Sequence, residues 1–436
     1  MQITKRFPYY ICLALLAYMP FHIFLSQSLS VLTGGLDVWK LAKDAIVALM
    51  TVFVICMVIV QGKANRVFAV LTSATAIYAV LHLLIWWLHP HIYDKSAMLG
   101  FILNVRILCF AVIGYGAVLL RPEPVRTDAL LKFVVWVGSA VATLGIIQYF
   151  LPADFLTHFG YSLERGVRPI FYIDGAQGFP RIMSTLREPN SLGAFLIIPA
   201  TVAALWLARA KQIKERWLWF GVGFVQALAI LLTFSRSAWI GLCVSLGMVL
   251  IWNFRQLAMQ LVKSFGLLAC AVVLLGAVGL YTQRHTDFVK SYVIHSSANS
   301  QDIDSNEYHV IFLKRGLQGI IDQPFGHGPG TAGLASIQNP QGSFLTENYY
   351  VQIGYELGVV GLALFVAVQI WLVLRLWVLR NTILGSVLLA SFVSYVIINM
   401  LLHIWSNEAV ACQWWMLAGI ALAAAGAKPE RVQKAQ

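Results

Sequence analysis

Charged residues are scarce in this sequence. Only 11% of its 436 residues are Asp, Glu, Lys or Arg, whereas about 25% is usual for a soluble globular domain. Hydrophobic residues make up 59% of the chain. This composition excludes a water-soluble protein and predicts a polytopic membrane protein.

The sequence has few cysteines, and it lacks the common nucleotide-binding and catalytic motifs. All six cysteines lie inside apolar runs, which predicts buried small side chains and argues against a disulfide framework or a thiolate metal site. The chain has no Walker loop, no G-x-S-x-G elbow, no HExxH helix and no glycine-rich dinucleotide fingerprint. Mononucleotide, serine-hydrolase, zinc-protease and dinucleotide chemistry therefore have no motif in their favour.

The net charge of +12 arises from 31 basic and 19 acidic residues. The basic residues are scattered between apolar runs and form neither a continuous face nor a tail, so no nucleic-acid partner is expected. Basic short loops are typical of membrane proteins that obey the positive-inside rule. They predict that both termini lie in the cytoplasm.

Long hydrophobic runs fill most of the chain. A helix needs about 20 apolar residues to cross a bilayer, so we predict an all-α integral membrane protein with about twelve transmembrane helices. Lys5 and Arg6 precede the first run and no small-residue cleavage site follows it, which predicts a helix that is retained. The runs cover residues 8–31, 43–61, 66–88, 98–120, 130–151, 190–208, 217–234, 236–254, 260–281, 349–374, 382–403 and 407–426.

Two segments, 152–189 and 282–348, are too long to be plain connections. The charge rule places both outside the membrane, in the periplasm or the exterior, and their Gly, Pro and aromatic content predicts ordered loops. In the second loop, residues 305–321 have amphipathic periodicity, and one face carries Val310, Leu313, Leu317, Ile320 and Ile321. We therefore divide the chain into 1–151 (five membrane helices), 152–189 (outer loop), 190–281 (helices six to nine), 282–348 (large outer loop), 349–426 (helices ten to twelve) and 427–436 (disordered cytoplasmic tail).

The segment 181–190 carries Arg181 and Arg187 directly before a predicted helix. Pro189 suits a loop or a first helical turn, and Asn190 or Ser191 can cap the helix that follows. Guanidinium groups beside a helix N-terminus suit phosphate oxygens, and Asn190 is a substrate-binding candidate beside them. Contact with phospholipid headgroups or ion pairing within the loop is the alternative interpretation of these arginines.

Three further arginines are candidates for the same chemistry. Arg236 lies in the tight turn between the seventh and eighth runs, and a charge near membrane depth costs about 2.5–3.5 kcal/mol on insertion scales, so it indicates a ligand site or a pathway. Arg106 is a charge within an apolar run, and Arg168 lies in the first outer loop. Both are weaker substrate-binding candidates.

Glu347, Asn348 and Tyr349 end the second loop and begin a predicted span. Glu347 can cap that helix, or it can act as a general base whose pKa is raised by desolvation. Asn348 and Tyr349 are candidates to orient the base or a sugar.

The second loop also holds Asp302, Asp304, His309 and His327. The Asp302–Asp304 spacing is similar to the Asp-x-Asp metal motif of nucleotide-sugar transferases, but a solvated loop is the simpler interpretation. His309 and His327 lack metal-ligand spacing and suit structural roles, and His309 is kept as a substrate-binding candidate.

Four motifs together resemble the bacterial O-antigen ligase/polymerase family, over about residues 180–420. They are the Arg181…Pro189-Asn190 segment, the Ser235-Arg236 turn, the glycine turn at Gly326, Gly328 and Gly330, and the Glu347-Asn348 block followed by Glu356-Leu-Gly358 and Gly361. Ligases of that family carry a histidine where this chain has Glu347. The difference favours a polymerase or another glycan-transferring relative.

The resemblance implies a membrane glycosyltransferase at the outer face of the bacterial inner membrane. Its donor would be a glycan on a polyprenyl (undecaprenyl) diphosphate, and its acceptor a glycan or a lipid-linked glycan within the lipid bilayer. The family works without a cofactor, a nucleotide sugar or a required metal. Arg181, Arg187 and Arg236 would hold the diphosphate, and Glu347 would be the base of an inverting displacement.

Other functions remain open. Transfer of the glycan to a lipid or protein acceptor would make the chain a ligase. A transporter or flippase of the same lipid-linked glycan fits twelve spans, although the chain shows no matching halves of the kind carriers have. A non-catalytic scaffold of envelope assembly would leave Arg236 unexplained.

Overall fold

The structure is a computed structural model that describes residues 2–173, 179–256, 305–340 and 342–426, with the isolated positions 259, 275, 278 and 282. It is almost entirely helical. The membrane-region helices are α1 (Gln2–Tyr18), α2 (His22–Thr33), α3 (Leu36–Val60), α4 (Arg66–Leu88), α5 (Asp94–Leu120), α6 (Thr127–Tyr149), α7 (Pro189–Arg209), α8 (Ile213–Leu232), α9 (Arg236–Asn253), α13 (Tyr349–Trp377), α14 (Ile383–Asn399) and α15 (Glu408–Gly426). The other elements are α12 (Ser305–Asp322), the 3-10 helices η1 (Met19–Phe21), η2 (Phe155–Phe159), η5 (Gly333–Gln338) and η6 (Ile404–Ser406), and the strands β1 (Phe171–Tyr172) and β2 (Pro180–Arg181).

Within the described residues, ten helical segments are long and apolar enough to cross a membrane. The first combines α1, η1 and α2 over Arg6–Thr33, and α14 is an additional apolar helix of 17 residues. These segments confirm the all-helical, multi-pass class. The predicted span 260–281 falls almost wholly outside the described residues, as do Asp302, Asp304 and the tail from residue 427. The full count of twelve and the side on which the termini lie remain predictions.

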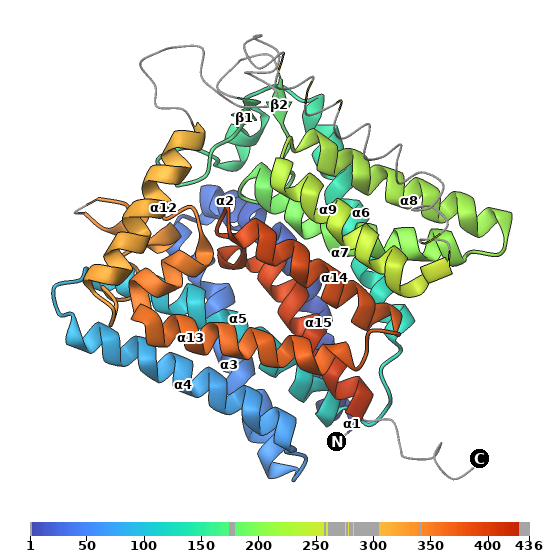
Figure 1. Cartoon of the computed structure of the whole chain (residues 1–436), viewed down its shortest axis with the longest axis horizontal. Helices are drawn as coiled ribbons and strands as arrows, with labels where there is room; N and C mark the ends of the chain where they lie inside the picture. Colours follow the sequence, from blue (N-terminus) through green and yellow to red (C-terminus); the bar gives the residue numbers. More distant parts are fainter. Residues whose placement is uncertain are drawn as a thin grey trace.

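Helices α5 and α15 form the centre of the bundle (Figure 1), where nearly every side chain is buried. Glycines permit their close packing: a Cβ on Gly114 would lie 2.3 Å from the Met416 carbonyl oxygen, and one on Gly419 would lie 2.3 Å from that of Ala111. Small residues of this kind let membrane helices approach closely. By contrast, α4, α8 and α9 keep most of their surface exposed, as expected for helices that face lipid.

The described residues of loops 150–188, 305–348 and 400–407 gather at one end of the bundle, which we call the loop end. In Figure 1 it lies toward the upper left, with α12, β1 and β2, while α1 begins at the lower right. The first loop is ordered around η2 and a short antiparallel pair in which Phe171 faces Arg181. The second contains α12 and η5. The described residues of both loops thus contain defined elements, and order over the full length of each loop remains a prediction.

Helix α12 matches the predicted amphipathic segment within one residue, but its apolar residues divide between two directions. Ile320 packs toward α13, where a Cβ on Gly354 would lie 2.7 Å from its Cδ1 atom. Val310, Leu317 and Ile321 remain 46–72% exposed. The periodicity predicted one apolar face. In the structure, part of that face packs against the protein and part is exposed.

Helix α13 is interrupted at Gly358, whose φ of 69° departs from helical geometry. The glycine turn docks into this break: the amides of His327 and Gly328 donate to the carbonyls of Tyr355 and Glu356, each at 2.9 Å. The Glu356 carboxylate accepts hydrogen bonds from the Gly330 amide at 3.0 Å and from Asn104 Nδ2 at 2.8 Å. These bonds fix the second loop onto the membrane helices.

Candidate active site

The described chain contains three non-glycine residues with positive φ, and each lies in one of the sequence motifs. They are Ser184 at 54°, Phe234 at 49° and Glu347 at 53°. Such conformations cost about 1–3 kcal/mol each and cluster at functional sites. Their positions indicate that the loops bearing Arg181, Arg236 and Glu347 are held in specific shapes.

Residues 181–188, which we call the arginine loop, are attached to α6 by hydrogen bonds. Gln148 Oε1 accepts hydrogen bonds from the amides of Met183 and Ser184 at 3.1 and 2.7 Å. The Ser184 hydroxyl donates to the Val141 carbonyl at 2.7 Å. The Ile182 amide also donates to the Leu232 carbonyl at 3.2 Å, which fastens the loop to the end of α8.

Arg181 reaches the turn that carries Arg236. Its Nε donates to the Thr233 carbonyl at 2.9 Å and one terminal nitrogen donates to Asn190 Oδ1 at 3.0 Å. Ser235 caps α9 by accepting from the Ala238 amide at 3.4 Å, so Arg236 occupies the first turn of that helix. The structure therefore brings Arg181, Asn190 and the Arg236 turn together.

The cap predicted for the next helix was wrong. Helix α7 begins at Pro189, and its N-cap is Glu188, which makes no side-chain cap bond. Asn190 lies inside the helix, and its side-chain oxygen accepts from Arg181 instead. Ser191 donates its hydroxyl hydrogen to Glu188 Oε1 at 3.0 Å. The helix starts one position earlier because Pro189 is preorganised for the first helical residue.

Glu347 does not cap α13, because Asn348 does: Asn348 Oδ1 accepts from the Val351 amide at 3.0 Å. The Glu347 carboxylate lies 3.4 Å from His309 Nδ1, between α12 and α13. Burial raises the pKa of Glu347 to about 7, and the nearby Glu188 carboxylate adds to the shift. A carboxyl group of this kind exchanges protons near neutral pH.

His309 connects Glu347 electrostatically to the arginine side of the site. Burial lowers the pKa of His309, and repulsion from the Arg236 guanidinium lowers it further. Glu188 acts on Glu347 from the arginine loop. Three motifs that are distant in sequence therefore share one electrostatic environment, and His309, kept as a substrate-binding candidate, lies within it.

Two loop residues missed by the sequence analysis hold Glu347 in place. Thr346 donates its hydroxyl hydrogen to the Asn348 carbonyl at 2.9 Å and lies 3.1 Å from His403 Nε2. Burial lowers the pKa of His403 to about 4, so this imidazole is neutral at pH 7. Since the single hydroxyl hydrogen of Thr346 is already used, His403 must donate through Nε2. No spacing signal in the sequence marks His403.

Arg187 contacts a different segment from Arg181. One of its terminal nitrogens donates to the Gly166 carbonyl at 3.3 Å in the first loop. Arg168 is exposed, with its guanidinium carbon 5.9 Å from the centre of the Phe171 ring. No contact places Arg168 beside Glu347, and its role as a substrate-binding residue remains a prediction.

Two other candidates lie in the protein core. Tyr349 is fully buried and donates its hydroxyl hydrogen to Asn104 Oδ1 at 3.2 Å. Arg106 is 4% exposed and forms ion pairs with Asp44 at 3.0 Å and Glu408 at 3.2 Å. Both acids begin predicted apolar runs, and that signal could have identified them. The structure places neither Tyr349 nor Arg106 with the Glu347 group.

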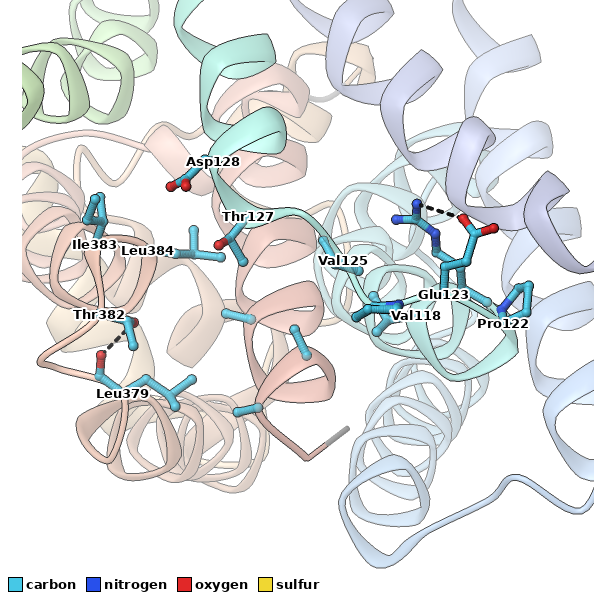
Figure 2. Close-up of a pocket in the computed structure, with 15 residues that line it drawn as sticks. Val118, Pro122, Glu123, Val125, Thr127, Asp128, Leu379, Thr382, Ile383 and Leu384 are labelled. Carbon is cyan, nitrogen blue, oxygen red and sulfur yellow. Dashed lines mark hydrogen bonds and ion pairs between the residues drawn. The ribbon is translucent and has the colours of Figure 1, made fainter. Parts of the chain in front are cut away.

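The opposite end of the bundle contains a cavity of about 670 Å³ (Figure 2). Glu123, Asp128, Thr382 and Leu384 line it, together with the last turns of α15. None of the predicted site residues contributes to it. For the described residues, no group of three or more His, Cys, Asp or Glu side chains is arranged to hold a metal ion. The expectation of a reaction without a metal remains a prediction.

Comparison with known proteins agrees with this geometry. Residues 221–366, from α8 to the middle of α13, match the family described as O-Antigen ligase. That range includes Arg236 and Glu347, whereas Arg181 and Arg187 precede it. An O-antigen polymerase of Salmonella muenchen is 19% identical over 318 residues, which is 72% of this chain and 77% of that protein.

Fold and site thus define a multi-pass membrane enzyme with a charged loop end. Over residues 221–366 the chain matches the O-antigen ligase family, and with its similarity to an O-antigen polymerase this identifies an enzyme of the O-antigen ligase/polymerase type. The resemblance inferred from the four motifs is confirmed.

Proposed function

We propose that the chain transfers a glycan from a polyprenyl diphosphate to a sugar hydroxyl of an acceptor glycan, at the outer face of the inner membrane. The observation that carries the proposal is the contact of Glu347 with His309, whose imidazole is within electrostatic reach of Arg236. It joins a proton acceptor that titrates near neutral pH with a cation suited to a leaving diphosphate. The match to O-antigen enzymes supports the substrate class.

Arg187, which the sequence predicted to share in donor binding, contacts the Gly166 carbonyl instead. In this mechanism, Arg181 and Arg236 bind the diphosphate of the donor. They stabilise the negative charge that develops as the bond between the anomeric carbon and the phosphate oxygen breaks. The electron pair of that bond leaves with the diphosphate. Arginine suits this role because it stays charged and its planar fork matches phosphate oxygens.

The Glu347 carboxylate removes the proton from the acceptor hydroxyl as that oxygen attacks the anomeric carbon from the opposite face. One displacement inverts the anomeric configuration. His309 contacts the base on the side of α12 and can hydrogen-bond to it through Nδ1. Asn348 sets the start of α13 and so fixes the position of the preceding Glu347.

The test is glycan transfer by purified protein from a polyprenyl-diphosphate oligosaccharide, with EDTA present, for the wild type and for Glu347→Gln. We expect the wild type to extend chains and the variant to lose about 10²–10⁴-fold in turnover, as for removal of a general base. Glu164→Gln, in the first loop and exposed, is the matched control and should retain activity. Wild-type turnover in Glu347→Gln would refute the role of the base.

Acceptor choice separates the related functions. Extension of the same lipid-linked glycan would identify a polymerase, and transfer to a different lipid or to a protein would identify a ligase, which the name of the matched family favours. If no bond forms with any of several donors, a transporter of the lipid-linked glycan becomes the better explanation.

A further inference from the structure

Two cations from different parts of the chain converge on one turn of the first outer loop. Lys40 Nζ, on α3, donates to the Arg165 carbonyl at 3.1 Å. Arg187 donates to the next carbonyl, that of Gly166, at 3.3 Å. Because these carbonyls are consecutive, the ammonium and guanidinium groups lie beside two adjacent peptide units.

The turn itself is firmly attached to α2. The Arg165 side chain donates to Gln27 Oε1 at 3.0 Å and also binds Ser30 Oγ. Gly166, with a φ of 77°, closes the turn by donating to the Leu163 carbonyl at 3.0 Å. A Cβ at Gly166 would have no neighbour within 4 Å, so the space beside this peptide is open.

Positive charge is in excess around Lys40. Arg187, Arg165 and Lys43 repel its ammonium group, and Asp37 is the acid that attracts it. Asp37 is exposed and also pairs with Lys95 at 3.1 Å, while Lys43 is paired with Asp44 at 2.9 Å. A local excess of cations attracts anions to this turn.

This cluster is separate from the Arg181 side of the site. Arg181 contacts Thr233 and Asn190, whereas Arg187 contacts the 163–166 turn. Glu188, which acts on Glu347, follows Arg187 directly in the chain. In the arginine loop, Arg181 thus contacts the Arg236 turn, and Arg187 contacts the turn that Lys40 also binds.

We propose that Lys40, Arg187 and the 163–166 turn form a second anion subsite, the Lys40 subsite, which binds the phosphate of the lipid carrier that bears the acceptor glycan. An ammonium group and a guanidinium fork on one open turn are suited to phosphate oxygens. This inference rests on the proposed glycan transfer, and it specifies an acceptor that is itself linked to a lipid phosphate.

The test compares two fluorescent acceptors in nanodiscs of phosphatidylcholine at a fixed, saturating concentration of donor. One acceptor is the polyprenyl-diphosphate oligosaccharide, and the other is the same oligosaccharide as an alkyl glycoside without phosphate. The variants are Lys40→Gln, which removes the charge, and Lys40→Arg, which retains it. Lys95→Gln is the matched control, because it removes a cation of the same loop end that pairs with Asp37.

Lys40→Gln should raise the KM of the diphosphate acceptor about tenfold or more, as for loss of a charge-assisted hydrogen bond, and leave the KM of the glycoside and kcat unchanged. Lys40→Arg should restore the wild-type KM, and Lys95→Gln should resemble the wild type. Equal changes for both acceptors, or no change for either, would overturn the subsite.

A parallel series with phosphatidylglycerol in the nanodiscs distinguishes the source of the phosphate. An effect of Lys40→Gln that appears only with phosphatidylglycerol, and equally for both acceptors, would support a phosphate subsite but assign it to a phospholipid headgroup. Wild-type protein that extends neither acceptor would refute the proposed function itself. Activity on both acceptors with an unaltered Lys40→Gln variant would refute the subsite alone.

Discussion

At the residue scale, Glu347 combines a left-handed backbone with a raised pKa. Its neighbours on both sides are tied to the 400–407 loop: Thr346 contacts His403, and Asn348 Nδ2 donates to the Met400 carbonyl at 3.0 Å. These bonds resist relaxation of the strained backbone. The carboxylate is therefore held in one place while it gains and loses a proton.

The pKa of about 7 for Glu347 predicts how turnover depends on pH. A general base acts when deprotonated, so kcat/KM should rise with pH through a midpoint near 7 and fall about tenfold per pH unit well below it. A pH–rate profile of the purified protein measures this dependence.

Glu188→Gln provides an internal comparison for that profile. The Glu188 carboxylate contributes to raising the pKa of Glu347, so its neutralisation should move the midpoint toward lower pH. A midpoint that stays in place, or moves upward, would contradict the electrostatic link between the arginine loop and Glu347.

Sequence reasoning located Arg181, Arg236 and Glu347 in loops that the structure brings to one end of the bundle, because each stands beside an apolar run. It could not identify Thr346 or His403, whose contact joins positions 57 residues apart. Arg106 was predicted to bind substrate because the sequence does not reveal its ion-pair partners. These partners, Asp44 and Glu408, lie 62 and 302 residues away in the chain. Pairing across such separations depends on tertiary packing, which one sequence does not display.

At the element scale, the interrupted helix α13 organises the second loop. Gly358 supplies the break, and a Cβ there would lie 2.3 Å from the Pro324 carbonyl oxygen. The glycine turn was evident from its spacing, and α12 was predicted almost to its ends. The docking of that turn into α13 was not predicted, because it depends on backbone groups that any sequence carries.

Gly358→Ala should release residues 323–333 from α13, since alanine tolerates neither the positive φ nor the close carbonyl. We expect faster hydrogen exchange in that segment and a loss of about tenfold in turnover, because the same loop leads to Glu347. Gly247→Ala is the control, as a Cβ there meets nothing within 4 Å. Unchanged exchange in Gly358→Ala would show that the docking is not needed.

At the scale of the whole molecule, Arg106 joins three helices. It pairs with Asp44 on α3 and Glu408 on α15, and it donates to the Ser406 carbonyl at 2.7 Å. These contacts lie where α3, α5 and α15 meet, next to the 400–407 loop. They favour a structural role over the substrate-binding role predicted from its position in an apolar run.

Arg106→Met should lower the thermal unfolding midpoint in detergent by about 5 °C or more, since it leaves Glu408 without its ion-pair partner and Asp44 with Lys43 alone. The KM of the folded fraction should stay at the wild-type value. Arg66→Met, at the exposed start of α4, serves as the control. A wild-type unfolding midpoint combined with a raised KM would instead support direct substrate binding by Arg106.

The attachment of Thr346 and Asn348 to the 400–407 loop also bears on biogenesis. Ribosomes make the chain from its N-terminus, so Glu347 is synthesised before Met400 and His403. During that interval the base has no partner loop to hold its left-handed backbone. The nascent enzyme should therefore stay inactive toward lipid-linked sugars until α14 has inserted and α15 has begun to follow.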